Sequence, residues 1–348
     1  MQEISNLYQG YLKKKRLFLG VLFLLLLAVS VIAITAGSIK IPFYEVLSTI
    51  IRLDTSNRGR IIWDVRMPRV LGAILVGAGL SLSGVMMQSV LKNPLASPYT
   101  LGLSSAAAFG ASFAIVFLGA GTSTTSTIIV SNFVSVALSA FVFSVISMVA
   151  ILALTLLTSI SSQSMVLAGI AIGSIFSAGL TLMQYLANSV QLASIVSWTF
   201  GDLGRANWRA LGIISLALIP LWLLALWYRW DFNAMDSGED SAKALGVRTN
   251  SIRIFGMLSA SILSAIIVSF FGTIAFIGLL GPHIARRLIG GDHRFLLVAS
   301  PLIGSFILLI SDTFARTILA PMVLPVGILT SLLGGPLFIY LLIARRRR

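Results

Sequence analysis

The segment SMVLAGIAIGSIFSAGLTLMQYLA, residues 164–187, consists of apolar and small polar side chains and carries no charge. It lies within a longer stretch, from Asn93 to Gly201, in which 109 consecutive residues are uncharged. A soluble domain has about 25% charged residues, whereas this chain of 348 residues has 10% charged and 57% apolar residues. A membrane-spanning helix needs about 20 apolar residues. The sequence therefore predicts a bundle of membrane helices, and it excludes a secreted domain, a disordered chain and a typical cytosolic enzyme.

Outward from this segment, hydropathy predicts an all-α polytopic fold with ten spans in one domain, residues 17–344. The first run is longer than the apolar core of a signal peptide, so we interpret it as a retained span. Between Arg253 and Arg286 there are only 32 residues, all uncharged, and two of the predicted spans must share them. The ten predicted spans are residues 17–37, 70–90, 99–120, 128–156, 164–187, 210–228, 252–270, 272–290, 296–317 and 324–344.

The net charge of +14 is concentrated at the ends of apolar runs rather than on one folded face. Basic clusters stand in the N-terminal tail, residues 1–16, and in the C-terminal tail, residues 345–348. Lys and Arg next to spans mark the cytoplasmic side, so we expect both termini to be cytoplasmic and the number of spans to be even. This alternation puts 16 of the 25 basic residues inside, and six of the others fall between Lys40 and Arg69. The pattern does not resemble that of a nucleic-acid-binding protein.

The residues that carry common enzyme chemistry are scarce. There is no cysteine, and the two histidines, His283 and His293, cannot form a histidine metal cluster alone, so we expect neither a metal site nor a bound cofactor. No G-x-x-x-x-G-K-[ST], H-E-x-x-H or G-x-S-x-G motif occurs. We therefore expect a transport protein rather than an enzyme, driven by a partner or by an ion gradient. An ion-gradient-driven secondary transporter of a small solute remains the alternative, although the third, fourth and fifth predicted spans contain no ionisable group.

Four motifs, in order along the chain, make the prediction more specific. They are RMPR (66–69) followed by NPLASP (93–98), then SGEDSAKALGV (237–247), then GLLGPHIARR (278–287), and finally DTFAR (312–316) with LPVG (324–327) and GGPLF (334–338). Together they resemble the FecCD-type permease family over residues 17–344, including the vitamin B12 permease. One departure, the alanines in SSAAAFG (104–110), replaces one kind of small residue by another.

This resemblance implies the type II ABC importer permease fold, in the cytoplasmic (inner) membrane of a prokaryote. It implies a second copy or a paralogous permease, two ABC ATPase subunits that use ATP and Mg, and an external substrate-binding protein. The cargo of such permeases is a metal chelate: we expect an iron-siderophore because that class is common, with haem or cobalamin as further members. Some relatives carry oxyanions, and no residue here decides among these cargos.

The polar loop at about residues 230–250 is the predicted contact with the ATPase. Glycine breaks the chain there, acidic residues follow where a helix N-terminus favours them, and a short apolar face comes next. The resemblance implies that this is the coupling helix. Read without it, the loop is a solvated interfacial helix. The residues concerned are Gly238, Glu239, Ala242, Leu245, Gly246 and Val247.

Arg66, Arg69 and Arg316 lie near the outer ends of their predicted spans. In the family, arginines at these positions meet acidic residues of the substrate-binding protein, and an arginine fork suits carboxylates. The alternative is internal pairing, because Asp312 and Arg316 are four residues apart on one helix.

Two short inner turns are the predicted cytoplasmic gate. In related permeases these turns approach the twofold axis, and the matching residues here are Asn93, Leu95, Ser161 and Ser162. The alternative is ordinary turn chemistry, since Asn-Pro and serine clusters form turns anyway. The predicted pathway lining follows the fifth span, with packing as the alternative for each residue. That lining is Met165, Ser174, Ser177, Met183 and Gln184, continued by the segment after that span and by the tenth span.

Overall fold

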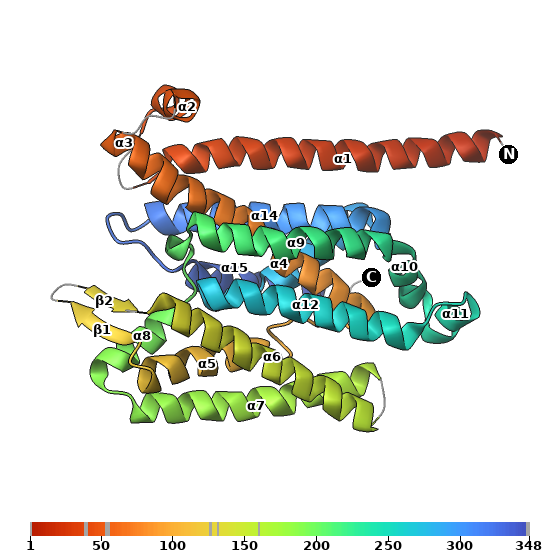
Figure 1. Ribbon diagram of the computed structural model, residues 1–348. Coiled ribbons are helices and arrows are strands. Elements are labelled where there is room, and N and C mark those ends of the chain that lie inside the picture. The colour runs from red at the N-terminus through yellow and green to blue at the C-terminus, as the bar shows by residue number, and fades with distance from the viewer. Residues whose placement is uncertain are drawn as a thin grey trace.

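The computed structural model describes residues 2–37, 41–52, 56–124, 127–130, 132–158 and 161–345. Long helices run side by side along one axis (Figure 1). They are α1 (Gln2–Thr35), α4 (Met67–Val90), α6 (Phe133–Thr158), α7 (Ser162–Leu186), α9 (Trp208–Trp227), α12 (Thr249–Phe271), α14 (His293–Thr317) and α15 (Val326–Arg345).

Shorter elements connect these helices. At one end are α2 (Phe43–Arg52), α3 (Asn57–Arg60), the π-helical turn η1 (Ile61–Arg66), and the hairpin of β1 (Gly121–Thr124) and β2 (Thr127–Val130), in which Gly121 pairs with Val130. At the opposite end are α10 (Arg229–Ser237) and α11 (Glu239–Ala244) (Figure 1). The remaining elements are α5 (Leu103–Phe117), α8 (Ser189–Thr199), the 3₁₀ turn η2 (Leu203–Arg205) and α13 (Ile277–Ile289).

Each of the ten predicted spans contains a helix, and the all-α bundle is confirmed, with the small β hairpin added before α6. Seven helices within the described residues are long and apolar enough to cross a membrane. The other three positions hold α5, α13 and α15, and α15 is apolar over Val326–Pro336. The predicted spans 99–120 and 272–290 are therefore too long, because α5 starts only at Leu103 and α13 has 13 residues. At 1.5 Å per residue, α13 extends over roughly 20 Å, short of the roughly 30 Å hydrocarbon core.

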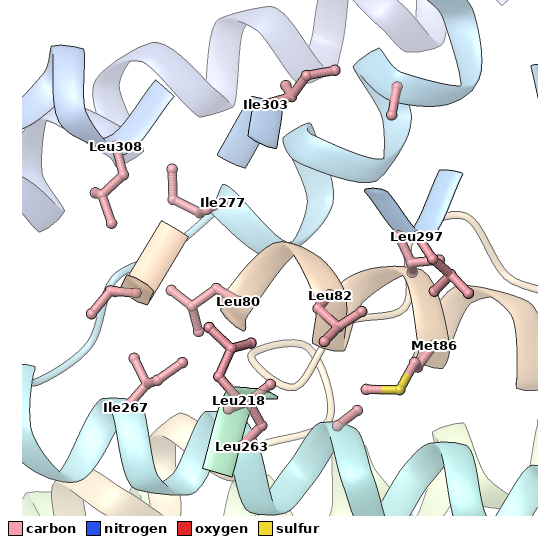
Figure 2. Packing of buried hydrophobic residues seen from close by; sticks show 14 of the residues in the cluster. Leu80, Leu82, Met86, Leu218, Leu263, Ile267, Ile277, Leu297, Ile303 and Leu308 are labelled. Carbon is pink, nitrogen blue, oxygen red and sulfur yellow. The ribbon is translucent and has the colours of Figure 1, made fainter. Parts of the chain in front are cut away.

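Helix α4 lies at the centre of the bundle, packed against α9, α12, α13 and α14. Figure 2 shows Leu80 and Leu82 of α4 between Leu263 of α12 on one side and Ile277 of α13 and Leu297 of α14 on the other. In contrast, α1 and α7 lie at opposite edges of the bundle and have mostly exposed faces (Figure 1). The outer helices therefore have most of their side chains at the surface of the chain, whereas α4 is the internal axis.

Small residues allow the close helix contacts. A Cβ on Gly77 would lie 2.5 Å from the Gly304 carbonyl oxygen, and a Cβ on Gly84 would overlap the backbone of Gly278. In lipid, where apolar surface offers no hydrophobic drive, such backbone approach supplies the packing energy. Gly169 and Gly173 of α7 meet the turn before α5 in the same way.

Candidate functional site

The predicted coupling loop forms two short helices that protrude from one end of the bundle (Figure 1). We call these two helices with the turn that follows them the α10–α11 segment, residues 229–247, and this end of the molecule the α10–α11 end. The break between the helices is Gly238, at φ 130° and ψ 151°. Only glycine adopts this backbone region readily, so the sharp corner follows from that residue. Glu239 and Asp240 then occupy the first turn of α11, where the helix dipole favours negative charge.

The apolar residues of this segment do not share one exposed face. Ala242 is fully buried against the protein itself, whereas Leu245 is 73% exposed. Val247 is half-buried, and Gly246 has a positive φ of 83° with open space around it. A partner docking here can contact Leu245 directly, while Ala242 anchors the segment to its own chain.

Glu239 joins this segment to the interior. Its carboxylate lies 3.1 Å from Lys243 Nζ and 2.9 Å from Arg253 Nη2. The hydrogen bond from Arg253, followed by that from Lys243, holds the pKa of Glu239 below its usual range. Arg253 of α12 also donates from Nε to the Val90 carbonyl at 3.3 Å, the last residue of α4. The α10–α11 segment is thus tied through one buried guanidinium to the end of the central helix.

A second connection runs through α10 and His293. The Asn233 side-chain oxygen accepts from the His293 backbone N–H at 2.8 Å and lies 3.0 Å from His293 Nδ1. The other ring nitrogen lies 2.6 Å from Ser89 Oγ, near the end of α4. Burial raises the pKa of Asp236, and the Arg286 guanidinium 3.3 Å away opposes that increase. The sequence alone does not predict the contacts that join Asn233, His293 and Ser89. Its one signal for them is Asp292, which stands before an apolar run as a helix N-cap.

The two predicted gate turns are built by local hydrogen bonds. The Asn93 side-chain oxygen accepts from the Leu95 backbone N–H at 2.9 Å, and Leu95 is exposed. Ser161 caps α7 by accepting from the Ser164 N–H at 3.1 Å, and Ser162 begins the helix. Turn chemistry therefore accounts for Asn93 and Ser161, while the gate role of all four residues stays a prediction.

The predicted pathway residues on α7 fall on two different faces. Met165 and Met183 are buried against the rest of the chain. Ser174 and Ser177 are exposed, and their hydroxyls donate to the Ile170 carbonyl and to Ser105 Oγ. Gln184 is half-buried. The serine face of α7 is therefore at the surface of the single chain, and the pathway role of all five residues stays a prediction.

An open hollow of about 450 Å³ lies beside α15. The polar residues that line it are Tyr99, Thr199, Thr273 and Ser331, and none of its lining residues is charged. Ile328 and Ser331 belong to the tenth predicted span, and Thr199 and Phe200 to the segment after the fifth, whereas Tyr99 and Thr273 belong to neither; the pathway role of these parts stays a prediction. The apolar lining comes from Phe200, Ala275, Ile328 and Leu332, and Gly327 completes it.

The three predicted docking arginines lie at the end of the bundle opposite the α10–α11 end, and each has partners within the chain. Arg69 Nε donates to both oxygens of Asp312 at 2.9 and 3.1 Å, and Arg316 Nε lies 3.0 Å from Asp312 Oδ2. Asp312 is fully buried, and Arg69 and Arg316 are 8% and 6% exposed. The internal pairing considered for Asp312 and Arg316 is confirmed.

Arg66 and Arg316 also bind the C-terminus of α1. Arg66 Nη1 donates to the Ile34 and Thr35 carbonyls at 2.7 and 3.0 Å, and Arg316 Nη2 donates to Ala33 at 3.1 Å. These carbonyls belong to the last turn of a helix, where no intrahelical donor reaches them. Arg66 and Arg69, two of the six basic residues between Lys40 and Arg69, therefore have structural partners, as Arg316 does, and the docking role of the three stays a prediction.

The FecCD transport family matches residues 24–344, nearly the whole chain. The chain belongs to the FecCD transport family. A protein of Methanocaldococcus jannaschii named as an ABC transporter permease is 45% identical over 347 residues, 99% of each chain. The hemin transport system permease of Yersinia pestis is 35% identical, over 96% of this chain and 97% of its own.

The fold of this FecCD protein is similar to a solved structure described as an inward-facing metal-chelate type ABC transporter. The TM-score is 0.80 at 31% identity, over 94% of this chain and 99% of the other. The chain is therefore a membrane-embedded permease of the ABC importer class. In this FecCD permease, the two groups of contacts described above lie at opposite ends of the bundle. The α10–α11 segment contacts α4 at one end, and the arginines that bind Asp312 lie at the other.

Proposed function

We propose that this permease pairs with a second copy, or with a paralogous permease, to form a pathway for a metal chelate. An external substrate-binding protein delivers the chelate, and two ABC ATPase subunits drive its passage. The observation that carries this proposal is the tie from Glu239 through Arg253 to Val90, which links an exposed surface segment to the central helix. A segment so connected transmits a partner's movement to the end of α4, next to the predicted gate.

The uncharged hollow beside α15 supports a bulky chelate as cargo. Its hydroxyl and aromatic lining offers weak contacts and no strong metal ligand, so cargo would pass without being trapped. The hemin relative and the metal-chelate transporter of similar fold favour an iron chelate. Iron-siderophore is our first choice, with haem next and cobalamin third. A panel of ferric siderophores, hemin, cobalamin and oxyanions, offered to the cognate binding protein, tests that order by measured Kd.

The charge distribution supports a cytoplasmic location for both termini and for the α10–α11 segment. The N-terminal end of α1 lies at the same end of the bundle as that segment (Figure 1). Cysteine labelling from either side of the membrane tests this orientation, because the chain has no native cysteine. A single cysteine at Ser241 should react only from the cytoplasmic side, and one at Arg58 only from outside.

The exposed Leu245 is the sharpest test of ATPase docking. Leu245→Asp should weaken capture of the ATPase subunits severalfold, because a charge replaces an apolar anchor at a protein interface. Deletion of residues 238–247 should abolish capture. Leu288→Asp, on an exposed leucine of α13 outside the α10–α11 segment, is the matched control. Full capture by the Leu245→Asp variant would refute this docking surface.

Docking of the binding protein on Arg66, Arg69 and Arg316 is tested by charge reversal. Arg66→Glu with Arg69→Glu should weaken docking most at low salt, where screening is least. Because these side chains hold α1 and Asp312, only the folded fraction, isolated by size exclusion, enters the comparison. Unchanged affinity of that fraction would remove the docking assignment.

A further inference from the structure

A second cavity opens at the surface of the bundle, at the end opposite α10 and α11. It has a volume of about 490 Å³ and is formed by the start of α6, the start of α9 and the end of α12. Its walls are apolar over most of their length. They include Phe133, Leu138 and Phe141 of α6, Ile213 of α9, and Ile266 and Phe270 of α12.

The polar groups of this groove are concentrated at one end. Asn207 and Arg209 stand at the start of α9, and both are exposed. The remaining polar lining residue, Ser269, donates its hydroxyl to the Ile266 carbonyl at 2.8 Å and is thus satisfied within its own helix. The groove is therefore amphipathic. We call its apolar part the slot and the end that carries Asn207 and Arg209 the mouth.

Arg209 is available to a ligand. Within the part of the chain that the structure describes, its side chain forms no hydrogen bond or ion pair. Asn207 is already engaged, because its side-chain oxygen accepts from the Ala210 N–H at 2.9 Å and its amide donates to the Arg205 carbonyl at 3.2 Å. The Arg209 guanidinium is therefore the unused strong donor at the mouth. It is permanently charged and can donate charge-assisted hydrogen bonds to a phosphate.

Two tryptophans set the depth of the mouth in the membrane. Trp208 is next to Arg209, its ring lies 6.3 Å from that of Trp63, and its Nε1 donates to the Trp63 carbonyl at 3.0 Å. Tryptophan is enriched at the level of lipid headgroups. This enrichment indicates that Arg209 stands at headgroup level and that the apolar slot extends from it along α6 toward the hydrocarbon region.

We propose that this groove is a binding site for an anionic phospholipid, with one acyl chain in the slot and the headgroup phosphate on Arg209. Such a site depends on the membrane location of the chain and not on the identity of its cargo. A zwitterionic lipid would fill the slot equally well, but its headgroup cation weakens the attraction to Arg209. The site therefore predicts selectivity for lipids of net negative charge.

The test is native mass spectrometry of the full chain in mild detergent, titrated with phosphatidylglycerol or with phosphatidylcholine of the same acyl chains. Arg209→Gln should lower phosphatidylglycerol binding roughly fivefold, which corresponds to about 1 kcal/mol for one basic residue at an anionic surface, and should leave phosphatidylcholine binding unchanged. Arg60→Gln, on an exposed arginine of α3 outside the groove, is the control and should change neither.

A second variant tests the slot itself. Ile213→Trp places a larger side chain in the groove and should reduce binding of both lipids. Retained preference for phosphatidylglycerol in Arg209→Gln, or unchanged binding of both lipids in Ile213→Trp, would overturn the proposal. Competition by inorganic phosphate at millimolar concentration would do so as well, because it would show a free-anion site rather than a lipid site.

Discussion

Arg253 Nη2 lies 2.9 Å from Glu239 Oε2, and the same guanidinium donates from Nε to the carbonyl of Val90. The Arg253 side chain is 1% exposed, whereas Glu239 stands at the surface of α11. One buried group therefore contacts both the α10–α11 segment and the C-terminus of the central helix. Movement of α11 cannot leave the end of α4 unaffected without breaking one of these two contacts.

Replacing Arg253 by methionine should uncouple ATP hydrolysis from transport. Methionine fills the space of the aliphatic part of the arginine side chain but lacks the guanidinium, so both contacts are lost. A broken hydrogen bond to a charged group costs about 1.5–3 kcal/mol. We expect the assembled complex to hydrolyse ATP while its uptake per ATP falls severalfold. Reconstituted proteoliposomes give both rates from one sample.

Lys243→Ala is the matched control for that experiment. Lys243 also pairs with Glu239, at 3.1 Å, but its side chain is largely exposed, and exposed pairs contribute about 0–1 kcal/mol. Uptake per ATP should stay near that of the unchanged protein. Equal uncoupling by both variants, or by neither, would contradict the role assigned to Arg253.

Asp312→Asn should destabilise the bundle strongly. The fully buried Asp312 carboxylate balances Arg69 and Arg316, and loss of one partner of a buried ionic group costs about 3–5 kcal/mol. Thermal unfolding in detergent should show a clear fall in Tm, while Asp64→Asn, on an exposed carboxylate nearby, should leave Tm unchanged. A Tm for Asp312→Asn within one degree of the unchanged protein would show that this cluster does not hold the helices together.

Gly84→Ala and Gly212→Ala should have opposite consequences. A Cβ at Gly84 overlaps the Gly278 backbone, whereas a Cβ at Gly212 has nothing within 4 Å. Overpacking costs about 1–3 kcal/mol, while alanine is favoured over glycine inside a helix by about 1 kcal/mol. Thermal unfolding should therefore show a lower Tm for Gly84→Ala and an equal or higher Tm for Gly212→Ala. The same small change in both would mean that α4 and α13 are not in such close contact.

The ionisation of the Asp292 carboxyl should make the thermal stability of the protein depend on pH. Burial raises the pKa of this carboxyl, but hydrogen bonds from the Arg294 side chain and backbone outweigh it and lower the pKa from 3.8 to about 2. Its contribution is therefore complete above pH 4 and is lost as the pH falls from 4 to 2. Asp292→Asn should lower Tm at pH 7, and the difference from the unchanged protein should shrink over that range. A difference that is constant with pH would contradict the ionic role.

The positions of the helices could be predicted from hydropathy, because each span must be apolar over its own length. The length of α13 could not, since it depends on the backbone between Gly272 and Phe276, where both residues have positive φ. Hydropathy does not report such local conformation. The crowding of two predicted spans between Arg253 and Arg286 was the one available sign of a short helix.

Side-chain contacts within one helix could be predicted from the sequence, whereas contacts between helices far apart in the sequence could not. Asp312 and Arg316 are four residues apart, which places them on one face. Arg69 is 243 residues from Asp312, and Arg253 is 163 residues from Val90, so only the packed bundle brings them together. For the same reason, burial of Ala242 and exposure of Leu245 do not follow from the pattern of α11 alone.

We have proposed that this permease works with ABC ATPase subunits to import a chelate. Uptake of a radiolabelled ferric chelate by proteoliposomes that contain the purified permease, its ATPase partner and its binding protein tests this proposal. We predict uptake that requires ATP and Mg, persists when ionophores dissipate the ion gradients, and accompanies a complex of two permease and two ATPase chains. Uptake without the ATPase that collapses with the ion gradient would contradict the account and identify a secondary transporter instead.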